Sequence, residues 1–184
     1  MLVVAEREQL PVAQARAGDT EAWDTLFRRY QLPLYVYAFE LVHDEQAALD
    51  IVQETFINAA RHLATLRDDE RFGSWLFGIA HQKCIQRWRK ADREKLFFEE
   101  LPESSIDPIP TPDELLIREE QESRFIDLIN QLPAPQRSVL LLHYLEDFSL
   151  EQIAEVTKAS VGTIKSRLFY ARKALNRLME DQSL

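Results

Sequence analysis

Hydrophobic positions recur at spacings of three and four residues along most of the chain, and this period predicts helices. From about Val12 to Asp92 the helical pattern continues with little interruption. It restarts at Thr111, where threonine can cap a helix, proline stands at the first helical position and a glutamate follows three residues after the cap. This helix is expected to run to Gln131 and to end near Pro133. Only four glycines occur in 184 residues, which disfavours a sheet-and-turn architecture, so the predicted fold class is all-α.

The C-terminal part predicts two short helices joined by a tight turn. Ser149 and Gln152 form a capping box, in which the two side chains satisfy free backbone amides at the start of a helix. Ser160 can cap the next helix in the same way. Within the unit from 132 to 178 this is the pattern of a helix-turn-helix, whose second helix enters the DNA major groove. The apolar contacts between the helices are expected from Ile153, Ala154, Val161, Ile164 and Leu168.

The second of these helices has an outward face suited to DNA. When its apolar positions from Val161 to Leu175 are buried, polar, basic and aromatic side chains point away from the core. Gly162 permits close approach of the backbone, and the amino end of the helix favours an anion. An amphipathic helix of an ordinary bundle, with cations that are merely solvated, is the alternative. The residues expected at DNA are Gly162, Thr163, Lys165, Ser166, Arg167, Phe169, Tyr170, Arg172 and Lys173.

An acidic stretch separates two helical parts of the chain. Residues 93–111 contain Pro102, Pro108 and Pro110 and show no helical period, which predicts an extended linker. Residues 93–122 hold 10 acidic and 3 basic side chains, whereas residues 123–184 hold 7 acidic and 8 basic. The formal net charge of −9 therefore comes mainly from one short stretch, and the C-terminal part is too weakly basic to hold DNA without help. The predicted organisation is an N-terminal tail (1–11), a helical domain (12–92), an acidic, proline-containing linker (93–111) and a small helix-turn-helix domain (112–184).

One helix of the N-terminal domain carries a polar, acidic stripe. The spacing between Asp50 and Phe56 places Asp50, Gln53, Glu54 and Asn58 near one face, with apolar side chains largely elsewhere. Taken alone, such a stripe is more often a solvated surface. The functional alternative is a docking face for a basic, amide-rich partner.

Aromatic and basic residues are interleaved between Phe72 and Lys90. Single-stranded nucleic acid requires flat rings that stack on unpaired bases and cations that follow the backbone. For Trp75 and Phe77 a core position is at least an equal alternative, whereas Trp88 stands beside three basic residues. The set comprises Phe72, Trp75, Phe77 and Trp88 with Arg71, Lys83, Arg87, Arg89 and Lys90.

The sequence contains no candidate catalytic or metal site. The four histidines are scattered, and His81 with Cys84 supplies too few ligands for structural zinc. His81 is instead expected at the surface or at nucleic acid. A single cysteine excludes an internal disulfide and fits the cytoplasm. Without an apolar run of about 18 residues or a signal-peptide pattern, we expect no membrane insertion, and we expect neither a cofactor nor enzyme activity.

Three segments in this order resemble the extracytoplasmic-function (ECF) sigma factors, group IV of the main sigma family of bacterial RNA polymerase. Residues 50–56 are similar to the polymerase-docking helix of that family. Residues 72–80 together with 89–90 are similar to its promoter-melting region. Residues 132–142 followed by 149–172 are similar to its reader of the upstream promoter element.

The resemblance implies a subunit that joins core RNA polymerase, directs it to promoters and is usually held by an anti-sigma factor. Asp50, Gln53, Glu54, Phe56 and Asn58 would serve polymerase binding, at the clamp coiled-coil of the largest subunit; the flap would be a second contact. The acidic linker would occupy the RNA path. The nine residues listed above for the second helix would read the minus-thirty-five element. The minus-ten element would be opened and held by Phe72, Trp75, His81, Lys83, Arg87, Trp88, Arg89 and Lys90.

Three positions depart from the family pattern. Lys158 stands where the turn of the helix-turn-helix commonly has glycine, and Gln82 and Gln86 replace asparagine and aspartate in the melting helix. These departures concern the turn and the promoter details, not the class of protein.

Two other functions stay open. A stand-alone helix-turn-helix transcriptional regulator would need a basic, dimerising C-terminal domain that binds a palindrome without polymerase. A helical adaptor that only docks on polymerase would leave the basic-aromatic segment and the second helix of the helix-turn-helix without a role.

Overall fold

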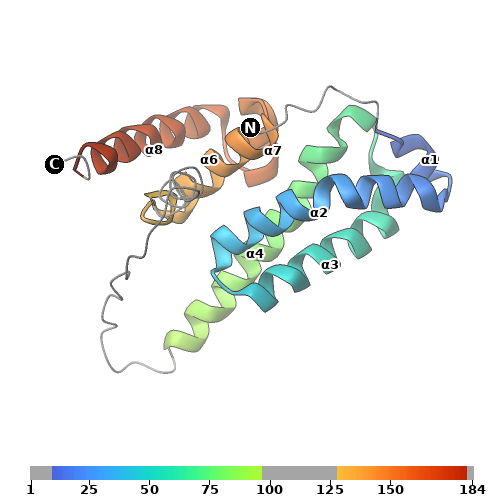
Figure 1. The fold of residues 1–184 in the computed structure, drawn as a ribbon, viewed down its shortest axis with the longest axis horizontal. Coiled ribbons are helices and arrows are strands. Elements are labelled where there is room, and N and C mark those ends of the chain that lie inside the picture. The colour runs from blue at the N-terminus through green and yellow to red at the C-terminus, as the bar shows by residue number, and fades with distance from the viewer. Residues whose placement is uncertain (1–9, 97–127, 182–184) are drawn as a thin grey trace, which may run out of the picture.

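The structure is a computed structural model that describes residues 10–96 and 128–181. Within these two ranges every regular element is a helix and there is no strand (Figure 1), which confirms the all-α fold class. Two short 3₁₀ turns, at Leu63–Thr65 and Asp69–Arg71, connect α3 to α4. The α-helices are α1 (Val12–Arg16), α2 (Thr20–Val42), α3 (Glu45–His62), α4 (Phe72–Leu96), α6 (Ala134–Glu146), α7 (Leu150–Thr157) and α8 (Val161–Asp181).

The helices α2, α3 and α4 lie side by side in one bundle (Figure 1). The side chain of Asp19 caps α2 by accepting from the amide of Glu21 at 2.9 Å, and that of Asp44 caps α3 by accepting from the amide of Ala47 at 2.7 Å. Between α2 and α3 His43 adopts a left-handed conformation with φ of 51°, which reverses the chain in two residues. These local signals set where α2 and α3 begin and how the chain turns between them, and α3 packs against α4.

The helix-turn-helix expected from the sequence is present as α7 and α8. The capping box is formed by Gln152 N–H donating to Oγ of Ser149 at 3.2 Å and by Ser149 N–H donating to Oε1 of Gln152 at 2.9 Å. Ser160 accepts from the amide of Thr163 at 3.1 Å and so caps α8. Lys158 takes the left-handed turn position with φ of 55°, which costs a non-glycine residue about 1 kcal/mol. The backbone amide of Lys158 donates to the carbonyl of Ala154 and closes the last turn of α7.

The predicted domain boundaries are only partly visible. The helix α4 continues to Leu96, so the boundary expected at Asp92 falls inside a helix; the added residues are arginine, glutamate, lysine and leucine, which all favour helix. The remainder of the expected linker, 97–111, and the expected helix from 112 to 127 lie outside the described residues. Residues 128–130 are helical, and the chain turns at Gln131 before Pro133.

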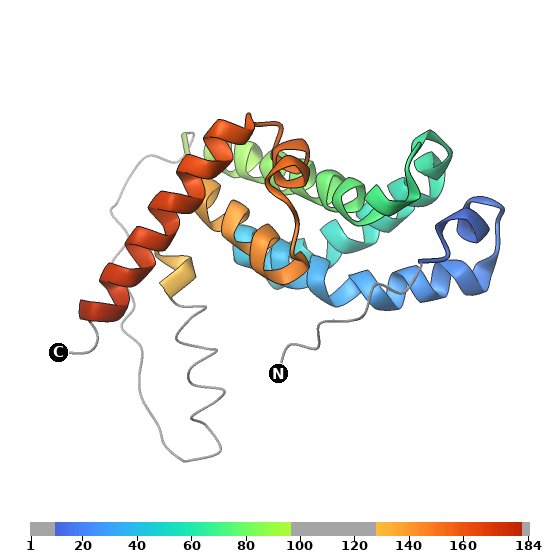
Figure 2. The same cartoon turned by 90° about the horizontal axis from the view of Figure 1, so that it is seen from above.

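The C-terminal helices pack directly on the N-terminal bundle. The helix α6 lies against α2, and α7 lies across α4, as Figure 2 shows from above. A continuous apolar core passes through this contact, in which the ring of Phe77 meets that of Phe148 edge-on at 5.5 Å. The sequence left open whether the two parts are packed together, and in this structure they are.

Buried polar groups also join the two parts. The hydroxyl of Tyr37 on α2 lies 2.7 Å from Nδ1 of His81 on α4 and 2.8 Å from Oγ of Ser138 on α6. All three side chains are buried. Burial, followed by the nearby charge of Arg167, lowers the pKa of His81 to about 4, so its imidazole is neutral near pH 7.

A buried arginine makes a second polar connection. Arg137 on α6 donates to the carbonyl of Glu40 at the end of α2 at 2.7 Å and contacts the ring of His43. Its guanidinium also donates to the carbonyls of Asn130 and Leu132 at 2.6 and 3.1 Å. One side chain therefore fixes both the turn before α6 and the contact between α6 and α2.

Replacing Arg137 by methionine should lower the free energy of unfolding by about 3 kcal/mol, because two buried carbonyls and a part-buried one lose a charged donor. Urea denaturation followed by circular dichroism measures the change. Arg61→Met, at an exposed position on α3, is the control and should stay within about 0.5 kcal/mol of the wild type. Equal stability of Arg137→Met and the wild type would contradict the anchoring role.

The buried histidine should make the protein acid-sensitive. Since the pKa of His81 is about 4 in the folded chain against an ordinary 6.5, protons bind preferentially to the unfolded chain. The stabilisation is full above pH 6.5 and is lost as pH falls toward 4. His81→Asn removes this titration, so between pH 7 and pH 4.5 the wild type should lose about 2–3 kcal/mol more than the variant. If the free energy of unfolding in urea had the same pH dependence in both proteins, the buried neutral imidazole would be contradicted.

Candidate nucleic-acid interface

The outward face of α8 is exposed as the sequence predicts. Ile164, Leu168 and Ala171 are buried on the opposite side, while Phe169 and Tyr170 are 61% and 57% exposed. The two rings meet edge-on at 5.4 Å. Of the nine residues predicted to contact DNA on this helix, Arg167 alone is half-buried, and the exposed ones are Gly162, Thr163, Lys165, Ser166, Phe169, Tyr170, Arg172 and Lys173.

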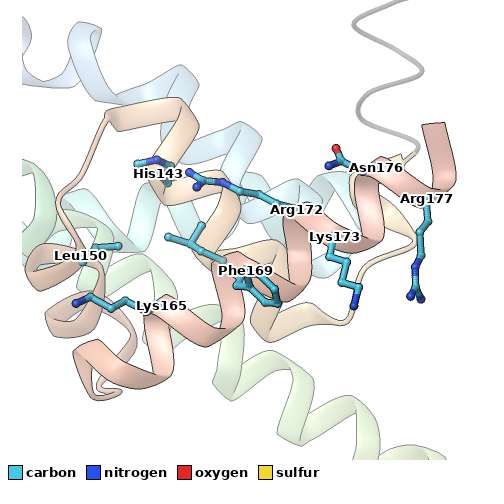
Figure 3. A pocket seen from close by; sticks show the side chains of 9 residues that line it. His143, Leu150, Lys165, Phe169, Arg172, Lys173, Asn176 and Arg177 are labelled. Carbon is cyan, nitrogen blue, oxygen red and sulfur yellow. The ribbon is translucent and has the colours of Figure 1, made fainter. Parts of the chain in front are cut away.

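A groove of about 720 Å³ runs along one flank of this face (Figure 3). Its apolar part is formed by Leu150, Leu168 and Phe169, with cationic side chains around it. None of the described residues that line it is acidic, so the groove offers both apolar contact and positive charge. The lining residues are His143, Leu150, Lys165, Leu168, Phe169, Arg172, Lys173, Asn176 and Arg177.

Five of these lining residues were not among the predicted DNA contacts, and one of the five, Leu168, was expected in the apolar core. Asn176 and Arg177 continue the flank one turn beyond Lys173, and the spacing of 169, 173 and 177 could have shown this. His143 and Leu150 come from α6 and the start of α7. Their place in the groove depends on how the helices cross, which their local sequence does not reveal.

The aromatic residues at the start of α4 are mostly core. Phe72 is fully buried, with its ring 5.6 Å from that of Tyr30. In this structure α2 covers the ring of Phe72, so it is not presented to a base, and its assignment to minus-ten DNA stays a prediction. Trp75 is half-buried beside Phe72, and Phe77 is in the core, the alternative that the sequence analysis kept open.

The prediction that His81 lies at the surface is wrong for this structure, and its assignment to minus-ten DNA stays a prediction. Its side chain is 8% exposed and contacts Tyr37, because α6 and α7 cover this side of α4. The sequence places His81 on an amphipathic helix but does not show that a second group of helices packs there.

Farther along α4 the basic residues remain near the surface. Trp88 is half-buried and its indole N–H donates to the carbonyl of Leu41 at 2.8 Å, which ties α4 to α2. Lys83 and Arg87 are half-buried and Arg89 is exposed. The side chain of Lys90 lies outside the described residues.

The acidic stripe of α3 faces solvent, and part of it is paired with α4. Gln53 and Glu54 are exposed, and Asp50, Phe56 and Asn58 are half-buried. Nζ of Lys83 lies 2.7 Å from Oε2 of Glu54, and Nη2 of Arg87 lies 3.1 Å from Oδ2 of Asp50. Hydrogen bonds from Gln46 and from Arg87 hold the pKa of Asp50 below its ordinary value. The structure thus joins two sites that the sequence predicted separately.

Metal and membrane chemistry find no support in the described ranges. No group of three or more potential metal ligands occurs there. None of the helices in those ranges combines the length and apolar character needed to cross a bilayer.

Comparison with known proteins gives matches in both halves of the chain. The family model described as Sigma-70 region 2 matches residues 26–94, and that described as Sigma-70, region 4 matches residues 122–175. The chain is 32% identical to the RNA polymerase sigma-H factor of Pseudomonas aeruginosa, with 97% of each chain covered. It is 30% identical to the ECF RNA polymerase sigma-E factor of Escherichia coli, with 92% of each covered.

A solved structure agrees with these relatives. The sigma factor RpoE of Bartonella quintana, in complex with the anti-sigma factor NepR, matches with a TM-score of 0.69 and 26% identity over 88% of this chain and 98% of that one. The resemblance noted in the sequence is confirmed, and the chain belongs to the ECF RNA polymerase sigma factors.

Proposed function

We propose that the chain joins core RNA polymerase, directs it to specific promoters and helps to open the minus-ten element. The observation that carries this function is the capped helix-turn-helix whose exposed face on α8 is basic and aromatic, in a chain that also presents an acidic stripe on α3. The initiation factor is not itself a catalyst, and it acts in the cytoplasm with polymerase. A stand-alone regulator is disfavoured, because residues 123–184 hold 8 basic and 7 acidic side chains and non-specific DNA affinity depends on phosphate neutralisation.

The α8 face would read the minus-thirty-five element. Ser166 and Tyr170 are exposed on this face and would contact base edges. Lys165 and Arg172, beside them, would contact phosphates. Charge supplied by only a few cations gives weak binding, which becomes useful when polymerase holds a second DNA contact in place.

The minus-ten element would meet α4. The side that carries Phe77 and His81 is covered by α6 and α7, so contact through that side requires the C-terminal helices to move away. The exposed side, with Gln82, Gln86 and Arg89, is available without such a movement. Contact through the covered side of α4 therefore requires α6 and α7 to separate from α4 first, and contact through the exposed side does not.

The partner set follows from the same surfaces. Asp50, Gln53, Glu54, Phe56 and Asn58 would meet the clamp coiled-coil, and the flap would hold the C-terminal part. The related RpoE is bound by an anti-sigma factor, and we propose an inhibitor of this kind for the present chain.

Run-off transcription from a library of promoter fragments tests the function directly. With core polymerase from Pseudomonas aeruginosa, new transcripts should appear only when the chain is added.

The double variant Asp50→Arg, Glu54→Arg should lose at least tenfold in core affinity, measured by fluorescence anisotropy, since it reverses the charge of the docking face. Glu21→Arg, Glu45→Arg reverses two exposed acids elsewhere and should bind as the wild type does. Unchanged core binding by Asp50→Arg, Glu54→Arg, with an intact fold, would remove the docking assignment.

Salt dependence tests the α8 face. Lys165→Ala, Arg172→Ala should weaken binding of the polymerase complex to a promoter fragment selected above. It should also reduce the slope of log affinity against log salt by about 2, one for each lost phosphate contact. Arg61→Ala, Arg67→Ala changes the net charge equally and should leave the slope unaltered. The same slope for all three proteins would show that this flank does not contact phosphate.

A further inference from the structure

The two ion pairs between α3 and α4 connect residues assigned to different partners. Asp50 and Glu54 belong to the proposed polymerase-docking face, and Arg87 and Lys83 to the proposed minus-ten face. Both pairs border a cleft of about 210 Å³ lined by Ile51, Glu54, Lys83, Gln86 and Arg87. Each carboxylate assigned to polymerase binding is therefore paired with a cation assigned to DNA binding.

We propose that these pairs couple the two binding events: docking of polymerase on Asp50 and Glu54 releases Arg87 and Lys83 for the single-stranded minus-ten DNA. This inference rests on the proposed function and adds a mechanism for its order of events. In the free chain the carboxylates screen the cations from phosphate, and the cations screen the carboxylates from polymerase.

The geometry favours a pair that is stable yet exchangeable. The Lys83 side chain is only 16% exposed, so its charge has little water around it and depends on Glu54 at 2.7 Å. Arg87 and Asp50 are 40% and 39% exposed, which leaves them open to a competing partner. Asp50 retains a second donor, Nε2 of Gln46 at 3.1 Å, and so stays charged and oriented when Arg87 departs.

The size of the effect follows from what such pairs contribute. Partly exposed ion pairs change an equilibrium by about two- to fivefold each. Two pairs that break together give about four- to tenfold once incomplete additivity is allowed for. Coupling between two sites is reciprocal. Bound polymerase should therefore raise the affinity for DNA by the same factor by which bound DNA raises the affinity for polymerase.

The test measures core affinity in the absence of DNA. Lys83→Gln, Arg87→Gln removes two residues that do not belong to the docking face, yet it should bind core polymerase about four- to tenfold more tightly than the wild type, because Asp50 and Glu54 no longer have to be released. A role of these cations in DNA binding or in folding alone would not tighten polymerase binding. The matched control is Arg61→Gln, Arg67→Gln, which loses the same charge at two exposed positions that pair with no other described residue; it should remain within twofold of the wild type.

The reciprocal arm measures DNA in the absence of polymerase. Asp50→Asn, Glu54→Gln should bind a fluorescent 12-nucleotide oligo-dT more tightly than Glu21→Gln, Glu45→Gln, which has the same net charge. The expected ratio is again about four- to tenfold.

The outcomes separate this proposal from the docking assignment. Equal core affinity of Lys83→Gln, Arg87→Gln and the wild type overturns the coupling even when Asp50→Arg, Glu54→Arg abolishes docking. Equal tightening by the Arg61→Gln, Arg67→Gln control overturns it as well, since bulk charge then explains the change. Equal oligo-dT affinities in the second arm also overturn it. Failure of Asp50→Arg, Glu54→Arg to weaken docking removes the proposed polymerase face itself.

Discussion

The packing of α6 and α7 on α2 and α4 determines what every other surface of this sigma factor can do. It buries the side of α4 that carries His81 and fixes α6 through Arg137. It leaves the outward face of α8 exposed. The same contact therefore covers part of one proposed DNA site and presents the other.

The interface is unusual in mixing an apolar core with buried polar groups. Phe77, Phe148 and Val156 belong to the apolar core of this contact, and Tyr37, His81 and Ser138 lie in it hydrogen-bonded to one another. Buried polar groups contribute little net stability when paired and are costly when unpaired. They make the contact specific for one register, and they remain compatible with water when the helices separate. If the helices separated, a purely apolar contact would expose an apolar patch that favours non-specific association.

Charged side chains of α3 and α4 are also paired with one another. The net charge of −9 is unfavourable for a DNA-binding protein taken as a whole, and two cations of α4, Lys83 and Arg87, are paired with acids of α3. As long as these pairs persist, Lys83 and Arg87 are not available to phosphate. On the proposed docking, polymerase would change that balance, because it would supply a second partner for the acids of α3.

Local chemistry was enough to predict much of the fold. The capping box of Ser149 and Gln152 and the buried face of Ile164, Leu168 and Ala171 depend on neighbours within one or two helical turns, and all were confirmed. The expected exposure of Phe72 and His81 was not found, because their surroundings are set by residues far away in sequence.

An amphipathic pattern shows that a helix has a side to bury; it does not show what will cover it. Tyr37 meets Ser138 across 101 positions, and no periodicity within either helix encodes that meeting. The polar residues at this contact carry the information in a different form. A tyrosine, a histidine and a serine on otherwise apolar faces each need a hydrogen-bond partner when buried, and in this chain the three side chains satisfy one another. A polar interruption of an apolar face is therefore the sequence feature that indicates a specific interface in this chain.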